Sequence, residues 1–444
     1  MPMSSSSATP PPDVAAPSPA GAFTPRGGFT YGLLGLPLAF VALPLYVILP
    51  NHYAREFGVP LATLGAILLG ARLFDAVIDP FLGRLSDRLF AESASAVLKL
   101  GALAAVVLAI GFALLFFPLV TSPTALVAWA AVVLVVTYAA YSALSVSHQS
   151  WGAMLGGDEA QRSRIVAWRE GLGLVGVVLA SITPVALGLT ASTALFFIAL
   201  TLGWLAWTRA PRPVACARAA QAIGSGGAAN MMWLPFEQPA FRALLAVFLL
   251  NGIASAVPAT LVLFFIQDRL QAPHGMEPLF LGGYFVCAAL SIPLWLAIVK
   301  RLGLARSWLA GMLLAIAVFG WATQLGTGDT TAFLVVCALS GVALGTDVAL
   351  PGAMLAGVIQ KAGQSGQAEG AYFGWWNFAT KLNLALAAGL ALPLLGVFGY
   401  APGARDAGGL NALTMAYCVL PCVLKLAASA CLYLFIIRKT ESAP

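Results

Sequence analysis

Residues 70–88 read GARLFDAVIDPFLGRLSDR, and this stretch decides the class of fold that the sequence predicts. It is apolar enough for a helix in a bilayer, yet Arg72, Asp75 and Asp79 interrupt it. Their spacing of i, i+3 and i+7 places the three charges on one helical face. Because an ionisable group at mid-bilayer costs a few kcal/mol even on lenient scales, each of these charges requires a role or a partner.

The composition of the whole chain agrees with a membrane helix at this position. The chain has 444 residues, of which 60% are hydrophobic and 9% are charged. An ordinary soluble domain has roughly 45–50% apolar and about 25% charged residues. These values exclude a soluble enzyme, a soluble nucleic-acid-binding protein and a disordered scaffold.

Twelve stretches of the chain are long enough to span a bilayer, for which a helix needs about 20 predominantly apolar residues. We therefore expect an all-α membrane protein with twelve transmembrane helices, arranged as two six-helix halves at residues 29–208 and 240–437. The intervening residues 209–239 form the longest polar interval within the chain and are expected to be a cytoplasmic linker. Residues 1–28 are rich in Ser, Pro and Ala and are expected to be a disordered cytoplasmic tail, with a second tail at 438–444. The twelve spans begin near Phe29, Pro60, Ser95, Ala125, Ile165, Ser192, Ala240, Pro278, Ser307, Thr331, Ala371 and Leu410.

The distribution of Lys and Arg predicts the orientation of these spans. With both termini in the cytoplasm, sixteen of the 23 Lys and Arg residues lie on the cytoplasmic side and three on the other side. Cytoplasmic loops of membrane proteins carry such an excess. We expect a multi-pass protein of the cell inner membrane, and the net charge of +6 then requires no nucleic-acid partner.

Two short motifs favour the architecture of major-facilitator transporters, in which paired six-helix halves enclose a site near mid-membrane. WGAML at 151–155 recurs as PGAML at 351–355, at equivalent places in the two halves. GRLSDR at 83–88 matches the Gly-x-Leu-x-Asp-Arg loop of major-facilitator proteins. We expect a gating and packing role for four residues of this loop: Gly83, Arg84, Asp87 and Arg88.

The charges inside the spans are the candidate functional residues. Asp75 and Asp79 cannot both stay ionised in a low dielectric without a cation, a shared proton or a neighbouring Arg or Lys. Lys381 in the eleventh span also needs a carboxylate partner, and we expect it to face a central cavity and reach the two acids. A pair of this kind that breaks during alternating access is one hypothesis, and a static salt-bridge cluster that fixes helix packing is the other. Lys425 is expected to snorkel or to pair locally.

Other polar residues in the spans are ambiguous. His148 can relay a proton or serve as a packing group. Arg169 and Glu170 point about 100° apart on a helix and need not pair with each other. The six cysteines show no metal-type clustering, so we expect them to act as small apolar residues and predict no metal site.

Three segments resemble the glycoside–pentoside–hexuronide:cation symporter family, the melibiose-symporter-like branch of the major facilitator superfamily. They are ARLFDAVIDPFLGRLSDR at 71–88, SWGAMLGGDEAQRSRIVAWREGLG at 150–173 and GQAEGAYFGWWNFATKLNLALAAG at 366–389. The resemblance implies a cation-binding site formed by Asp75, Asp79, Ser145 and His148. It implies a substrate site that contains Arg72, Arg169 and Lys381, with Trp376 and Asn377 on neighbouring helix faces.

Three positions depart from the pattern of that family. An asparagine between the two aspartates is replaced by Ile78, an acid of the fourth span by His148, and a sugar-gripping acid of the first span aligns near Ala39. Sodium prefers several oxygen ligands, and two are lost here. The sequence therefore favours proton over sodium as the coupling ion, and Ala39 weakens the argument for a sugar.

We accordingly expect a secondary active transporter that couples a cation to symport of a small polar solute, such as a sugar or glycoside, by alternating access. The alternative keeps the fold but moves an amphipathic or lysolipid-like solute. A membrane-embedded enzyme is the least favoured class, because no metal-ligand spacing, activated nucleophile or phosphate-binding glycine loop is present. The expected partners are the solute and the lipid bilayer, the expected state is a monomer, and no cofactor is predicted.

Overall fold

The computed structural model describes residues 23–59, 61–213, 230–273, 275–397, 399–400, 403 and 405–441, and these residues contain helices and no β-strand. Most of the predicted N-terminal tail and most of the predicted linker lie outside the described residues. Where the structure describes these segments it shows short helices. One begins at Pro25 in the predicted tail, and the other spans Asn230–Glu237 in the predicted linker.

The helices follow one another along the chain with few long connections. The first group comprises α1 (Pro25–Gly32), α2 (Gly35–Leu43), the π-helical turn η1 (Pro44–Ile48), α3 (Leu49–Glu56), α4 (Leu61–Glu92), α5 (Ala94–Phe116), α6 (Pro123–Met154) and α7 (Glu159–Thr208). The second group comprises α9 (Asn230–Glu237), α10 (Pro239–Phe264), η2 (Phe265–Arg269), α11 (Glu277–Leu302), α12 (Leu304–Ala322), α13 (Thr330–Lys361), α14 (Glu369–Val397), α15 (Ala407–Thr414), η3 (Met415–Val419), α16 (Leu420–Leu432), η4 (Tyr433–Ile437) and α17 (Arg438–Glu441).

Local sequence explains where several of these helices begin and bend. The Ser93 side chain accepts a hydrogen bond from the backbone of Ala96 and caps α5, and Asp158 caps α7 in the same way. The 50 residues of α7 form two helices joined at a kink, where Pro184 is followed by Gly188 with a φ of 81°. The kink separates the two spans that the hydropathy pattern predicts in this region.

Ten helices of the described chain are long and apolar enough to cross a membrane. They begin within a few residues of ten of the twelve predicted spans. The other two predicted spans correspond to α4 and α14, of 32 and 29 residues. Both are as long as the ten, and they carry the buried Asp and Lys residues described below. The all-helical membrane architecture is thus observed, and the count of twelve remains a prediction.

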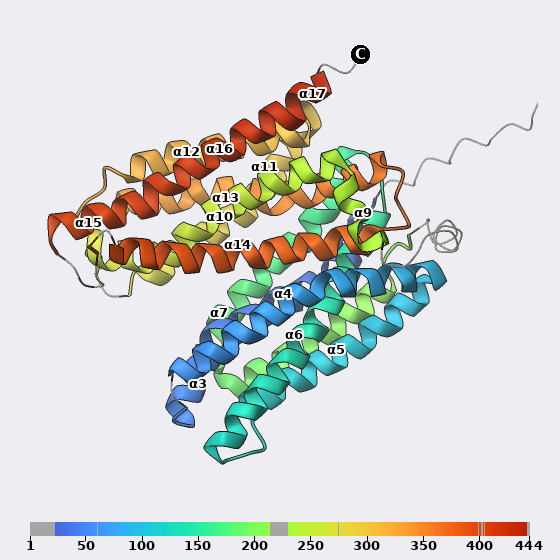
Figure 1. Cartoon of the computed structure of the whole chain (residues 1–444), viewed down its shortest axis with the longest axis horizontal. Coiled ribbons are helices and arrows are strands. Elements are labelled where there is room, and N and C mark those ends of the chain that lie inside the picture. Colours follow the sequence, from blue (N-terminus) through green and yellow to red (C-terminus); the bar gives the residue numbers. More distant parts are fainter. Residues whose placement is uncertain are drawn as a thin grey trace, which may run out of the picture.

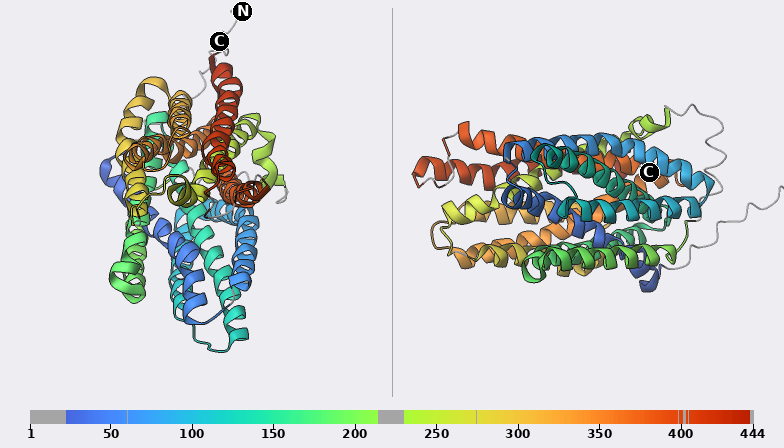
Figure 2. Two further views of the ribbon diagram at one scale, coloured as in Figure 1. Left: turned by 90° about the vertical axis from the view of Figure 1, so that its left-hand side faces the viewer. Right: turned by 90° about the horizontal axis from the view of Figure 1, so that it is seen from below.

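The helices are arranged as two groups that meet along α4 and α14 (Figure 1). Within each group the long helices run roughly parallel or antiparallel, as the view from below shows (Figure 2). One apolar core is formed by residues between Phe23 and Ala210, and two further cores are formed mainly by the second group. Residues at the contact between the groups are therefore positioned by two separately packed bundles.

The sequence of α4 separates an apolar outer face from a charged inner face. Leu73, Val77 and Phe81 are 56–58% exposed, as expected of side chains that face lipid. Asp75 and Asp79 are 1% and 0% exposed on the opposite side. Since lipid cannot solvate a carboxylate, this rotation of the helix places both acids against the second group of helices.

Candidate functional site

A central cavity of about 470 Å³ lies between the two groups of helices. Its walls come from α2, α6 and α7 of the first group and from α10, α13 and α14 of the second. The cavity therefore lies where the predicted fold places a solute. Its polar and aromatic lining includes Tyr141, Ser142, Ser145, His148, Gln149, Arg169, Glu170, Asp347, Trp376, Asn377, Thr380 and Lys381.

A buried cluster of charges joins α4 to α14 at one side of this cavity. The Lys381 ammonium lies 2.7 Å from Asp75 Oδ2 and 2.7 Å from Asp79 Oδ2. It also donates to Ser142 Oγ at 2.8 Å and to the Asp75 carbonyl oxygen at 3.3 Å. The Ser142 hydroxyl in turn donates to Asp75 Oδ1 at 2.6 Å. The structure thus brings together three of the sequence-predicted residues and adds a hydroxyl from α6.

The charges in this cluster do not balance. When both carboxylates are ionised they face one ammonium, which leaves one negative charge in excess in a buried environment. Arg72, one turn before Asp75 on α4, is partly buried and is the next cation along the helix. Four oxygen atoms lie within 3.3 Å of Lys381 Nζ, so the same position has the ligands that a small cation uses.

Ser142 is the residue of this cluster that sequence reasoning missed. The predicted hydroxyl, Ser145, lies three residues later on the same face of α6 and accepts a hydrogen bond from Gln149 at 2.9 Å. Gln149 also donates to Asn377 Oδ1 of α14 at 3.2 Å. The sequence does contain Ser142 about one helical turn before Ser145, but the motif alignment gave no reason to prefer Ser142 over Ser145.

His148 is packed within the first group of helices. Its Nε2 lies 2.8 Å from the Tyr31 carbonyl oxygen, and its ring stacks on the Tyr31 ring at a centroid distance of 4.4 Å. The Trp207 ring packs against it at nearly a right angle, with 5.5 Å between the ring centroids. The histidine lines the central cavity, while its hydrogen bond and ring contacts hold α6 against α1 and α7.

Arg169 and Glu170, whose pairing the sequence left open, form an ion pair. Arg169 Nε donates to Glu170 Oε1 at 2.8 Å. Two long side chains can turn toward each other across 100° of helix, and the buried guanidinium needs a counter-charge. On the facing wall of the cavity, Trp376 stacks on Phe248 at 3.8 Å between ring centroids.

The predicted gating residues lie within a helix rather than a loop, because α4 continues through them to Glu92. Asp87 accepts hydrogen bonds from the backbone of Gly370 at 2.6 Å and Ala371 at 2.9 Å, and so satisfies the first turn of α14. A Cβ added to Gly83 would lie 2.0 Å from the Gly370 carbonyl oxygen. The two helices therefore touch backbone to backbone at this end of the molecule. Arg84 is partly buried and Arg88 is exposed.

Comparison with known proteins identifies the family that has this architecture. A family model described as MFS/sugar transport protein matches residues 27–439. The chain belongs to this family. It is the melibiose-symporter-like family that the motifs in α4, α7 and α14 indicate, so that expectation is confirmed.

Solved structures of MFS transporters share the fold. A bacterial homologue of the iron transporter ferroportin in an outward-facing state has a TM-score of 0.69 at 16% identity, over 92% of this chain and 99% of that chain. The E. coli fucose:proton symporter FucP has a TM-score of 0.67 at 15% identity, over 92% of this chain and 99% of its own. No curated protein is significantly similar in sequence. Membership in the MFS indicates a transporter rather than an enzyme, of a kind that binds small-molecule solutes in a lipid bilayer without a cofactor.

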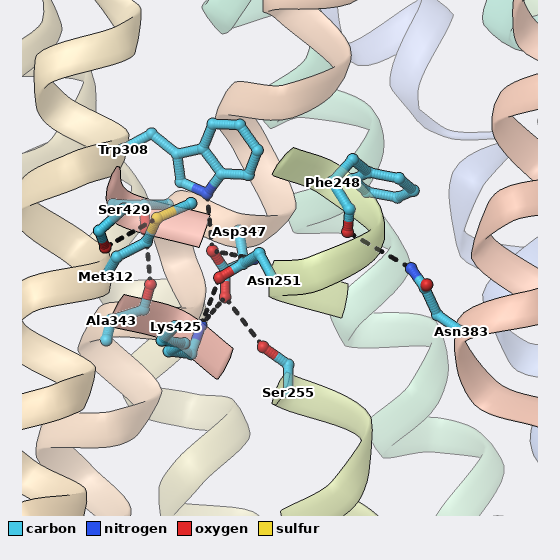
Figure 3. Close-up of polar contacts among 11 residues, drawn as sticks. Phe248, Asn251, Ser255, Trp308, Met312, Ala343, Asp347, Asn383, Lys425 and Ser429 are labelled. Carbon is cyan, nitrogen blue, oxygen red and sulfur yellow. Dashed lines mark hydrogen bonds and ion pairs between the residues drawn. The ribbon is translucent and has the colours of Figure 1, made fainter. Parts of the chain in front are cut away.

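This MFS transporter has a second buried ion pair, within its second group of helices (Figure 3). Lys425 Nζ of α16 lies 2.9 Å from Asp347 Oδ2 of α13 and donates to Asn251 Oδ1 of α10 at 2.7 Å. Asp347 also accepts from Asn251 at 3.0 Å, Ser255 at 3.2 Å and Trp308 at 2.8 Å. Here one acid faces one lysine and neutral donors complete the shell, so the pair is balanced, unlike the cluster at Lys381.

Asp347 also lies between two cavities of the transporter. It lines the central cavity and a second, mostly apolar cavity of about 200 Å³ inside the second group of helices. Among the described residues of this chain, no three His, Cys, Asp or Glu side chains are grouped to hold a metal ion.

Proposed function

We propose that the protein is a secondary active transporter of the cell inner membrane that couples symport of a small polar solute, a sugar or glycoside, to a proton. The observation that carries the proposal is the buried cluster of Asp75, Asp79 and Lys381 at the wall of the central cavity. A purely structural ion pair needs one carboxylate for each ammonium. The excess carboxylate gives an ion a place to bind.

The geometry of the cluster supplies a coupling mechanism. A proton on Asp75 or Asp79 removes the excess negative charge and weakens the electrostatic attraction between that side chain and Lys381. The lysine side chain is 20% exposed and lines the cavity, so it can turn toward a bound solute. Ion binding and solute binding then both change the contacts of Lys381. Coupling requires such a shared contact, because each ligand then alters the affinity for the other.

The proton is favoured over sodium by the residues around the acids. Ile78 offers no oxygen ligand, and the His148 Nε2 is engaged by the Tyr31 carbonyl. FucP, which shares the fold, is named as a proton symporter. Sodium is the alternative ion, supported by the four oxygen atoms around Lys381 Nζ.

The lining of the central cavity suits a polar solute. Asn377, Gln149 and the Arg169–Glu170 pair offer hydrogen-bond donors and acceptors, and Trp376 offers an apolar surface. A few placed polar groups within an apolar wall are typical of solute sites. The second candidate solute is amphipathic, and it is supported by the apolar wall that Leu38 and Ala39 form on α2.

The contact at Gly83, Asp87 and Gly370 is proposed as the closed cytoplasmic gate. Transport by alternating access then requires α4 and α14 to separate at this contact, which releases the first backbone amides of α14 from the Asp87 carboxylate. Since the solute cavity lies farther along the same two helices, opening this end exposes the cavity to the cytoplasm.

Labelling of introduced cysteines tests the proposed topology. Lys361 lines the same cavity as Pro239 at the start of α10, and Arg405 contacts Asp268 near the end of η2. The intervening 31 residues span about 46 Å at 1.5 Å per residue, more than the hydrocarbon core. An impermeant thiol reagent added outside intact cells should label Arg405→Cys and leave Lys361→Cys unlabelled. Labelling of both positions from the same side contradicts the topology.

Uptake into proteoliposomes tests the function. A panel of sugars, glycosides and amphiphiles is offered with an imposed pH gradient, a sodium gradient or neither. We expect at least one sugar or glycoside to accumulate with the pH gradient, and sodium to have no effect. Accumulation that follows sodium and ignores pH would overturn the ion assignment, and selective accumulation of amphiphiles would overturn the solute class.

A further inference from the structure

A third cavity, of about 390 Å³, lies between the two groups of helices at the end where α7 begins and α13 ends. Its walls come from the first turn of α7, the turn between α11 and α12, the last turns of α13 and η4. The proposed topology places it at the cytoplasmic surface of the membrane. Its charged lining residues are Glu159, Arg162, Arg306 and Lys361.

Arg162 of this cavity has Glu159 and Asp158 nearby but forms no ion pair with either of them. The residue is 8% exposed, and its Nη1 donates to the Gly157 carbonyl oxygen and to Gln360 Oε1. Its buried Nε has no hydrogen-bond partner. Within the part of the chain that the structure describes, no carboxylate forms an ion pair with it. A buried guanidinium whose Nε lacks a hydrogen-bond partner is costly, so an anion is expected beside it.

The other charged groups at the cavity strengthen this expectation. Glu159 is the acid of the lining, and its Oε2 accepts from the Leu304 backbone at 3.0 Å, where it caps α12. Arg306 and Lys361 add two further cations. Three cations of the lining therefore face one lining carboxylate that is already engaged, and the guanidinium fork of Arg matches the geometry of phosphate oxygens.

An apolar groove adjoins this cavity. A fourth cavity, of about 290 Å³, shares Met354, Val358, Lys361 and Ile436 with it and is also lined by Lys439. Phe435, which lines the groove, is 47% exposed on the outer surface of the helices. A basic pocket that continues into an apolar groove at the cytoplasmic face matches the head and the chain of a phospholipid.

We infer that this cavity binds a phosphate group, with Arg162, Arg306 and Lys361 as its ligands, and that the phosphate belongs to an anionic phospholipid whose chain lies in the adjoining groove. Because Arg162 belongs to the first group of helices and Lys361 to the second, the bound phosphate holds the two groups together at this end. The lipid then favours the conformation in which this end is closed.

The test uses the full-length purified protein and three probes: dioleoyl phosphatidylglycerol, dioleoyl phosphatidylcholine and inorganic phosphate. Lipid retention is measured by native mass spectrometry, and the thermal unfolding midpoint is measured with each probe. The variants are Arg162→Gln, Lys361→Gln and, as a matched control, Arg164→Gln. Arg164 lies two residues along α7, carries the same charge and lines neither cavity.

We expect phosphatidylglycerol to be retained and to raise the unfolding midpoint, with phosphatidylcholine much weaker. Arg162→Gln should weaken phosphatidylglycerol binding about tenfold and Lys361→Gln about fivefold, while Arg164→Gln leaves it unchanged. The exposed Lys361 keeps the test valid if Arg162→Gln does not fold. Stabilisation by inorganic phosphate with no effect of the lipid assigns the cavity to a soluble phosphate compound and overturns the lipid. Equal binding by wild type and both cavity variants overturns the site.

Discussion

In proteoliposomes, Asp75→Asn and Asp79→Asn should each abolish accumulation of the solute against its gradient, while exchange down the gradient partly survives. Either change leaves one carboxylate for the single ammonium of Lys381, so the cluster is neutral without an ion. The helices can then move with the solute alone, and the gradient of the ion no longer drives them. The loss of accumulation is complete because the ion has lost its site.

Two controls separate this result from a general loss of fold. Asp329→Asn makes the same acid-to-amide change at an exposed position between α12 and α13, and it should transport as the wild type does. Exchange of labelled for unlabelled solute should persist in the Asp75 and Asp79 variants. If both variants still concentrate solute, the cluster is a static bridge between α4 and α14 and the proposed coupling is wrong.

The largest loss of stability should follow from splitting the ion pair of Asp347 and Lys425. Asp347→Ala leaves the ammonium of Lys425, whose side chain is 6% exposed, with Asn251 as its remaining described partner, and removal of one member of a buried pair costs about 3–5 kcal/mol. Lys425→Met should cost less, because Asp347 keeps the donors of Asn251, Ser255 and Trp308.

The double variant Asp347→Ala with Lys425→Met should be more stable than Asp347→Ala alone, because no buried charge is left unpaired. Unfolding of the four proteins in detergent gives the interaction free energy as a double-mutant cycle. Additive losses would show that the two residues do not stabilise each other, contrary to the ion pair of 2.9 Å between them (Figure 3).

Helix positions could be predicted from the sequence because the width of a bilayer sets the length of each apolar stretch. Ten of the twelve predicted spans are recovered on that criterion. The other two predicted spans coincide with α4 and α14, helices of 32 and 29 residues that carry the buried charges.

The partners of buried charges were harder to predict, because they depend on how each helix is rotated about its axis. Lys425 and Asp347 are 78 residues apart, and nothing in either local sequence indicates that α13 and α16 turn these faces toward each other. For the same reason the sequence pointed to Ser145 for the cation site, whereas Ser142 is the serine that contacts Asp75 and Lys381. Motifs located Asp75, Asp79 and Lys381, since the family pattern carries information about packing that one sequence lacks.

The most direct measurement of the central claim records ion binding without any solute. Proteoliposomes adsorbed on a solid-supported membrane are exposed to a rapid change in pH, and the displaced charge is recorded for wild type and for the double variant Asp75→Asn with Asp79→Asn. Our account predicts a displacement in the wild type after a pH step, none in the double variant, and none in either protein after a sodium step at constant pH. An unchanged displacement in the double variant, or a wild-type response to sodium alone, would contradict it.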